Sequence, residues 1–187
     1  MAGEQDAAAR AAWRQMIATA DPRSLFFLDE TSTPTTMTPR RARSPRGTRV
    51  VDRVPRGKWE SVTLLATLTP TGLGPGFQFT GALDRDAFEA FVEELLVPTL
   101  TPGQTVVLDN LSVHKSATAR ALIEAAGCAL VFLPTSSPDF NPIEQAFAKL
   151  KQAARTVDAI LSATEAAYPL ITPADTRGFF TDCGDNL

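Results

Sequence analysis

The apolar residues of this chain fall into short blocks whose spacing changes along the sequence. Residues 5 to 19 are alanine-rich with apolar positions at helical spacing, and residues 24 to 29 hold a short continuous apolar run. Residues 61 to 68 alternate with β-branched residues, and residues 76 to 83 follow a segment rich in glycine and proline. This pattern predicts a leading helix, a buried strand and then two antiparallel strands joined by a turn.

The second half of the chain alternates between helix and strand spacing. Helices are predicted over 84 to 96, 116 to 126 and 143 to 155, with one or two more before the end, and strands over 105 to 109 and 128 to 133. Antiparallel strands followed by alternating strands and helices describe an α/β fold with a mixed sheet flanked by helices, which matches the ribonuclease H-like arrangement. We expect a lead-in helix or linker over residues 1–22 and one domain over 23–187.

Positive charge is concentrated in one window of the chain. Eight of the eighteen lysines and arginines lie between Arg40 and Lys58 with a single acid, Asp52, which leaves ten bases and twenty acids elsewhere. Residues 31 to 57 are predicted as a loop or hairpin with at most one strand, near 48 to 54. The window is either a local patch for a polyanion or a solvated arginine-rich loop, and charge alone favours neither.

The bulk composition is that of a globular protein. Of 187 residues, 44% are hydrophobic and 21% are charged, and the formal net charge is -3. No window approaches the ~18 uninterrupted apolar residues of a membrane helix, and the amino terminus lacks the basic start of a signal peptide, so we expect a cytoplasmic protein. Two cysteines and one histidine exclude a disulfide framework, a cysteine zinc site and a multi-histidine metal site.

Three acidic residues stand where a predicted strand ends or a predicted helix begins. Asp29 and Asp109 each close an apolar run, and Glu144 lies in the first turn of a helix after Asn141. Carboxylates brought to one rim of a sheet can form a cage for divalent cations, which prefer oxygen ligands. Each acid also has a local alternative: a turn or cap for Asp29, an Asx turn for Asp109, and a capping box with Asn141 for Glu144.

The loop after Asp109 carries further polar side chains. We expect Asn110, His114 and Lys115 to face the same cleft as Asp109, where a histidine beside a lysine suits phosphate contacts. The alternative is that His114, like most lone histidines, is structural.

The sequence blocks around the three acids extend well beyond the acids themselves. The string FLPTSSPDFNPIEQAFAKLKQAAR around Glu144 resembles the third-carboxylate block of mariner-like DDE transposases, in particular of their bacterial insertion-sequence branch. The strings VVLDNLSVHKS and FLDETS are similar to that family's second and first blocks, and the thirty-four residues between Asp109 and Glu144 match its spacing. The resemblance runs from about Leu25 to Gly184. The departures from the family pattern are Arg43, Ser136 and Phe140.

The resemblance implies a nuclease and strand transferase that acts at the ends of a mobile element. Asp29, Asp109 and Glu144 would be catalytic and would hold two metal ions, most naturally Mg²⁺ with Mn²⁺ as a substitute, ~4 Å apart. One ion would activate the attacking oxygen, and the other would stabilise the leaving 3′ oxygen. Asp109 is expected to bridge both ions, and Glu144 to orient the nucleophile.

DNA is the partner that the resemblance implies, both as element ends and as target. The family reads element ends with helix-turn-helix modules, for which the residues before Asp29 leave no room, so we expect recognition from another polypeptide or a frameshift product, unless it has been lost. Pairing of two ends implies at least a homodimer. The residues expected to contact phosphates, which position DNA without reading its sequence, are Arg40, Arg41, Arg43, Arg46, Arg49, Arg56, Lys58, Asn110, His114, Lys115, Lys149 and Lys151.

Two other interpretations stay open on the sequence. The chain is another enzyme, either a different ribonuclease H-like nuclease or a haloacid-dehalogenase-like phosphatase with Asp29 as nucleophile, although Thr31 stands where that phosphatase loop has a second Asp. Alternatively it is a degenerate or domesticated transposase remnant that binds DNA or protein without catalysis. The intact acids argue against decay, because folding does not require all three together.

Overall fold

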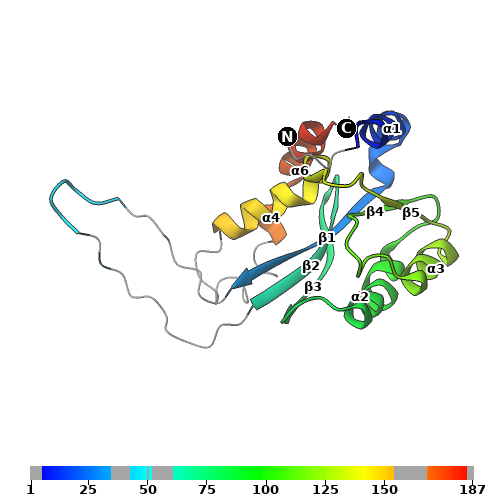
Figure 1. Ribbon diagram of the computed structural model, residues 1–187, viewed down its shortest axis with the longest axis horizontal. Coiled ribbons are helices and arrows are strands. Elements are labelled where there is room, and N and C mark those ends of the chain that lie inside the picture. The colour runs from blue at the N-terminus through cyan, green and yellow to red at the C-terminus, as the bar shows by residue number, and fades with distance from the viewer. Residues whose placement is uncertain (1–5, 35–42, 50, 52–60, 154–167, 185–187) are drawn as a thin grey trace.

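A five-stranded mixed sheet forms the centre of the computed structural model, which describes residues 6–34, 43–49, 51, 61–153 and 168–184 (Figure 1). The central strand is antiparallel to one neighbour and parallel to the other, and the outer pairs continue each arrangement. This is the predicted α/β arrangement. The strands are β1 (Leu25–Pro34), β2 (Ser61–Thr69), β3 (Gly72–Thr80), β4 (Thr105–Leu108) and β5 (Ala129–Phe132), in the order β3-β2-β1-β4-β5.

Helices cover both faces of the sheet, as Figure 1 shows for α4 and α6 on one side and for α2 and α3 on the other. Successive side chains of a strand point to opposite faces, so β1 places Phe27 in one hydrophobic cluster and Leu28 in the other. No helix in the described ranges is long and apolar enough to cross a membrane. The helices are α1 (Ala7–Thr19), α4 (Pro142–Ala153) and α6 (Pro173–Cys183) on the Phe27 face, and α2 (Arg85–Phe91) and α3 (Ala117–Ala125) on the Leu28 face.

Two helix starts follow from short polar residues that cap them. Asp84 accepts a hydrogen bond from the Ala87 N–H at 2.8 Å, which confirms it as the cap of α2. Ser116 does the same for α3 through the Ala119 N–H at 3.1 Å. The helix predicted to run to residue 96 instead changes to a π-helical turn over Val92–Leu96.

The strands differ from the prediction in two places. β1 continues to Pro34, so Asp29 lies inside a strand rather than at its end. β3 begins at Gly72, because Gly74 and Gly76 serve packing rather than a turn: a Cβ on Gly76 would lie 1.8 Å from the Tyr168 hydroxyl oxygen. Of the possible strand near 48 to 54, residues 48, 49 and 51 are not in a strand and the others lie outside the described residues.

Helix α1 packs against the body of the domain. Trp13 and Ile17 are each 5% exposed and lie in the same cluster as Phe27. The Trp13 ring stacks on Phe140 with 6.5 Å between centroids. The boundary predicted between residues 22 and 23 stays a prediction, but the lead-in helix shares its core with the sheet.

Candidate active site

Asp29 lies on β1 just beyond the end of that strand's pairing with β4. The parallel register runs from Leu25 to Phe27, whereas pairing with β2 continues to Pro34, so β1 is open toward β4 at Asp29. The carboxylate is on the Phe27 face of the strand, where it accepts hydrogen bonds from the Glu30 N–H at 2.8 Å and from the Asn141 amide at 2.7 Å. The strand and the start of α4 therefore fix Asp29 together.

The environment of Asp29 opposes its ionisation. The residue is only 5% exposed. Burial, followed by the negative charges of Glu30, Asp109 and Glu144, raises the pKa of its carboxyl to about 7, and the Glu30 N–H only partly offsets this. A cation near Asp29 would relieve both effects, because it replaces lost hydration and balances the neighbouring acids.

Asp109 follows β4 directly and is held by the loop after it. Its Oδ1 accepts the Leu111 N–H at 3.0 Å and lies 2.6 Å from His114 Nδ1. Burial acts to raise the pKa of Asp109, but the hydrogen bonds from His114 and Leu111 outweigh it, so the pKa is lowered. Asp109 is therefore an ionised carboxylate, in contrast to Asp29.

Glu144 completes the set from the first turn of α4. Its backbone N–H bonds to the Asn141 carbonyl at 3.2 Å, and its side chain is exposed. A helix start holds its backbone rigidly, so the position from which the Glu144 side chain leaves the chain is well defined. The side-chain amide of Asn141, predicted only as a cap, instead donates to Asp29.

The three acids line one cavity of about 330 Å³, here called the carboxylate cavity. None of its described lining residues is basic, so the walls of the cavity offer oxygen ligands. No group of three or more acids, histidines or cysteines among the described residues is close enough to hold a metal ion as it stands. The donors fit Mg²⁺ or Mn²⁺, but they surround an open cavity rather than a closed cage. The lining residues are Asp29, Asp109, Asn110, Leu111, Leu133, Ser136, Ser137, Pro138, Asn141 and Glu144.

His114 is the residue whose placement differs most from the prediction. The side chain is fully buried beneath the cavity, so the expected phosphate contact is wrong for this structure. Its Nε2 lies 3.1 Å from Glu30 Oε2, a charge contact without the direction of a good hydrogen bond. Burial would lower the pKa of His114, but the contacts with Asp109 and Glu30 raise it to about 9.

The other predicted phosphate contacts are spread over the molecule. Asn110 donates its amide to the Leu133 carbonyl at 2.5 Å, and Lys149 pairs with Asp175 at 2.7 Å, so both are engaged within the chain. Lys115 is exposed beside the carboxylate cavity, and Lys151 is half-buried on α4. Arg43, Arg46 and Arg49 are exposed around a turn at Gly47, whose φ of +89° favours glycine. Arg40, Arg41, Arg56 and Lys58 lie outside the described residues.

Sequence reasoning missed two residues of the site, Asn141 as a partner of Asp29 and Glu30 as a partner of His114. Glu30 had a usable signal, because neighbours on a strand point to opposite faces. A strand that delivers Asp29 to one side must deliver Glu30 to the other. No local pattern in the sequence indicated that His114 lies beside Glu30 on that face of the strand.

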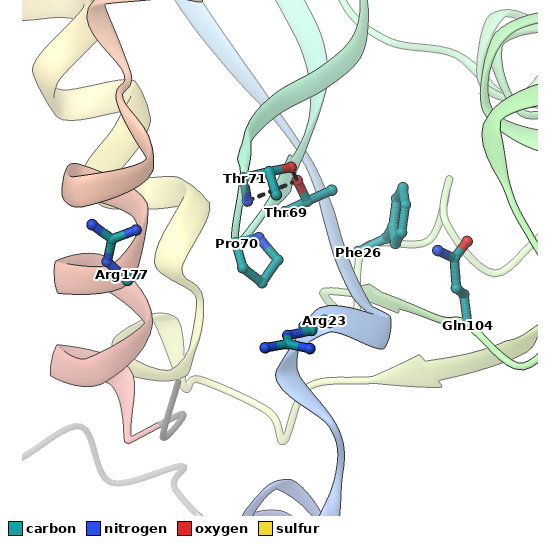
Figure 2. Close-up of a pocket in the computed structure, with 7 residues that line it drawn as sticks. All are labelled: Arg23, Phe26, Thr69, Pro70, Thr71, Gln104 and Arg177. Atoms are coloured by element: carbon teal, nitrogen blue, oxygen red, sulfur yellow. Dashed lines mark hydrogen bonds between the residues drawn. The ribbon is translucent and has the colours of Figure 1, made fainter.

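A second cavity, the arginine cavity, lies at the opposite end of β4 (Figure 2). It measures about 480 Å³, and two arginines from separate elements, Arg23 and Arg177, are among its lining residues. Both arginines are exposed, and none of the described lining residues is acidic. This cavity is larger, but none of its described lining residues offers a carboxylate to a cation. The remaining lining residues are Phe26, Thr69, Pro70, Thr71 and Gln104.

Comparison with solved structures identifies the fold. The chain is similar to a pre-cleavage Mos1 transpososome at 10% identity and a TM-score of 0.75, with 95% of this chain and 57% of the Mos1 chain covered. It is similar to the Mos1 mariner paired-end complex with Mn at 13% identity and a TM-score of 0.70, over 95% and 57%. It also matches the Mos1 transposase catalytic domain with Raltegravir and Mg at 10% identity and a TM-score of 0.65, over 95% and 89%.

The fold is therefore the ribonuclease H-like fold of that catalytic domain, and the chain spans little more than half the length of the Mos1 transposase in its complexes. A search of curated proteins returned no match. The family model described as "DDE superfamily endonuclease" matches residues 24–165, which include all three acids of the carboxylate cavity. On that match, the chain belongs to the DDE superfamily endonucleases.

Proposed function

We propose that this chain is the catalytic domain of a transposase, which cleaves DNA strands at the ends of a mobile element and transfers them to a target. The observation that carries the proposal is the carboxylate cavity, whose lining includes Asp29, Asp109 and Glu144 and no basic residue among those described. Nothing in the packing of the core requires three acids at this place. The same cavity lies inside the part of the chain that matches the endonuclease family.

Asp29, Asp109 and Glu144 would hold two divalent metal ions, Mg²⁺ or Mn²⁺. When bound, the ions supply activation of the attacking oxygen and stabilisation of the leaving 3′ oxygen in an in-line displacement. DDE transposases use divalent metals, and Mos1 has been solved with Mg and with Mn. Both are hard cations that suit carboxylate ligands.

The chain's own residues prepare the cavity for this chemistry. Asn141 donates to Asp29 Oδ2 and so directs the buried carboxylate from the α4 side. Asn110 ties the loop after β4 to the end of β5 through the Leu133 carbonyl, which holds two walls of the cavity together. Glu144 lies in the first turn of α4 and would orient the attacking water or 3′ hydroxyl.

The remaining partners follow from the same proposal. Element ends and target DNA would lie across the cavity. Exposed basic side chains such as Lys115 would contact the DNA phosphates. A homodimer would pair two ends, as the paired-end complexes of Mos1 do. End sequences would be read by a helix-turn-helix part on another polypeptide or a frameshift product, and the protein would act in the bacterial cytoplasm as a member of the insertion-sequence branch.

A nicking assay tests the proposal. Supercoiled DNA is incubated with the chain and Mg²⁺ or Mn²⁺, and Asp109→Asn is compared with Asp86→Asn, an exposed acid on α2 outside the cavity. We expect metal-dependent nicking that falls by on the order of 10³-fold in Asp109→Asn, since several kcal/mol of charge stabilisation are lost. Asp86→Asn should nick like the unmodified chain.

Two outcomes would count against the proposal. Cleavage that persists in Asp109→Asn would mean that another nuclease is responsible. No cleavage of any DNA by a folded, metal-bound chain would favour the non-catalytic remnant instead.

A further inference from the structure

The chain's single histidine is enclosed between two acids from different strands. His114 is fully buried, with Nδ1 2.6 Å from Asp109 Oδ1 and Nε2 3.1 Å from Glu30 Oε2. The Phe88 ring lies 4.9 Å from its ring centroid and closes the far side. We propose that His114 is a positioning residue that fixes the Asp109 carboxylate for metal binding from beneath the sheet.

The contacts of His114 with Glu30 and Asp109 lie just past the end of the backbone pairing between β1 and β4. The parallel ladder between β1 and β4 ends at the pair Phe27 and Val107, and Asp29 and Asp109 each lie two residues beyond it. Past that pair, no backbone hydrogen bond of the ladder sets the distance between the two strands. Glu30 and His114 continue the connection to Asp109 through side chains, from the face of β1 opposite to Asp29.

The oxygens of Asp109 are divided between two tasks. The contacts of the carboxylate with His114 Nδ1 and with the Leu111 N–H both fall on Oδ1. Within the described residues no donor bonds to Oδ2, and Asp109 lines the carboxylate cavity. One oxygen is therefore held by the protein while the other remains for a cation.

Carboxylate oxygens face both ring nitrogens of His114. The Nδ1 contact with Asp109 Oδ1, at 2.6 Å, is the one that reaches a cavity acid. Loss of this contact removes the positioning of Asp109 and should weaken binding of Mg²⁺ or Mn²⁺.

The competing explanation is that His114 merely fills the core. Ser116 provides a matched control, because it is 2% exposed, lies two residues away, caps α3 and bonds to Glu89 at 2.5 Å without touching Asp109. Ser116→Ala should lower the melting temperature, because it removes the cap of α3. It should leave the metal affinity within about twofold of the original, because Ser116 does not contact Asp109.

The first experiment measures Mn²⁺ affinity of the apo chain by calorimetry, beside thermal unfolding. We expect binding at least about tenfold weaker in His114→Ala, as for other residues that orient metal ligands. His114→Asn, whose side-chain amide can place a donor where Nδ1 contacts Asp109, should recover part of the loss. Unchanged or tighter binding in a folded His114→Ala would overturn the inference, as would weakening of the same size in Ser116→Ala.

The second experiment uses the fact that this chain has one histidine, so its imidazole ¹⁵N resonances need no assignment. We expect the Nδ1 resonance to move when Mg²⁺ is added, because its partner Asp109 then binds the ion. Asp109→Asn should abolish that response. A resonance that ignores Mg²⁺ at saturation would contradict a link between His114 and the cavity.

This inference rests on the proposed function for its metal, but the two fail differently. If the chain binds Mn²⁺ and responds at His114 without cleaving DNA, only the proposed function fails. If Mn²⁺ affinity does not depend on His114 while DNA is cleaved, only the positioning role fails.

Discussion

The two ends of β4 carry opposite charge, and they treat it in opposite ways. At its carboxyl end, the carboxylate cavity buries Asp29 almost completely and surrounds it with other acids, so its pKa rises to about 7. At its amino end, the arginine cavity holds Arg23 and Arg177 as exposed side chains. The first arrangement costs stability until a cation arrives, whereas water already solvates the second.

The difference shows why cavity size is a poor guide to function here. The arginine cavity is the larger, at about 480 Å³ against 330 Å³. Its two arginines are exposed, so water solvates their charges without a ligand. The carboxylate cavity contains Asp29, a buried carboxyl whose ionisation is unfavourable without a cation. Substitutions and metal titrations can test this difference between the two cavities.

The largest effect is expected from Asp29→Asn. The variant should bind Mn²⁺ at least about 100-fold more weakly, because a buried anionic ligand is lost. At pH 8 its apo form should be more stable, by up to about 4 kcal/mol, since folding holds the ionised carboxylate against a pKa raised from 3.8 to about 7. Calorimetry and thermal unfolding measure both. Wild-type affinity, or a less stable apo form, would remove the contrast between the two cavities.

Metal addition should produce the next largest effect. Saturating Mn²⁺, at about 100 times its dissociation constant, should stabilise the chain by roughly 2.7 kcal/mol, and a chelator should reverse this. The melting temperature reports the change. The same titration of Asp29→Asn should show little shift, and a full shift in that variant would place the ion elsewhere.

The arginine cavity should respond weakly. A chain with Arg23→Gln and Arg177→Gln should bind Mn²⁺ normally and nick DNA at the original rate. If these exposed arginines touch DNA at all, the slope of log affinity against log salt should fall by no more than about 2, one for each phosphate contact. A large loss of nicking would show that the two ends of β4 act together.

The smallest effect is expected at another exposed charge pair, Lys149 with Asp175 between α4 and α6. The hydrogen bonds from Lys149 and Thr172 lower the pKa of Asp175 to about 2 from its usual 3.8. Because the pKa in the folded state is depressed, the pair contributes stability above pH 3.8, which is lost as pH falls through 2.

Asp175→Asn should therefore flatten the loss of melting temperature between pH 4 and pH 2, with a change below about 2 °C at pH 5. Asp182→Asn, an exposed acid on the same helix, is the control. If the melting temperature falls equally between pH 4 and pH 2 in the unmodified chain, Asp175→Asn and Asp182→Asn, the Lys149–Asp175 pair contributes nothing to stability.

The order of elements could be predicted from the sequence because each has a clear period and a clear cap. The alternation in β2 and the cap at Asp84 identify their elements without tertiary information. The start of β3 could not be predicted, since Gly74 and Gly76 look like turn residues until Thr67 and Tyr168 are seen against them. Pro75 is tolerated in β3 because that strand is at the edge of the sheet.

The site was predictable where it depends on position in the chain, and not where it depends on side-chain direction. A carboxylate after β4 and another at the start of α4 follow from local pattern and resemblance. The direction of the Asn141 amide and the burial of His114 depend on segments over a hundred positions away in one case and on packing beneath the sheet in the other. Neither direction leaves a local signal.

Helix α1 is linked to the wall of the carboxylate cavity through the side chain of Arg10. Arg10 bonds to Ser137 Oγ at 2.7 Å and to both oxygens of Asp139, and its guanidinium lies 4.1 Å from the centroid of the Phe140 ring. Ser137 is a wall of the carboxylate cavity. One side chain of the first helix is thus linked to the wall of the cavity that holds the three acids, although the helix itself is not among the cavity's lining elements.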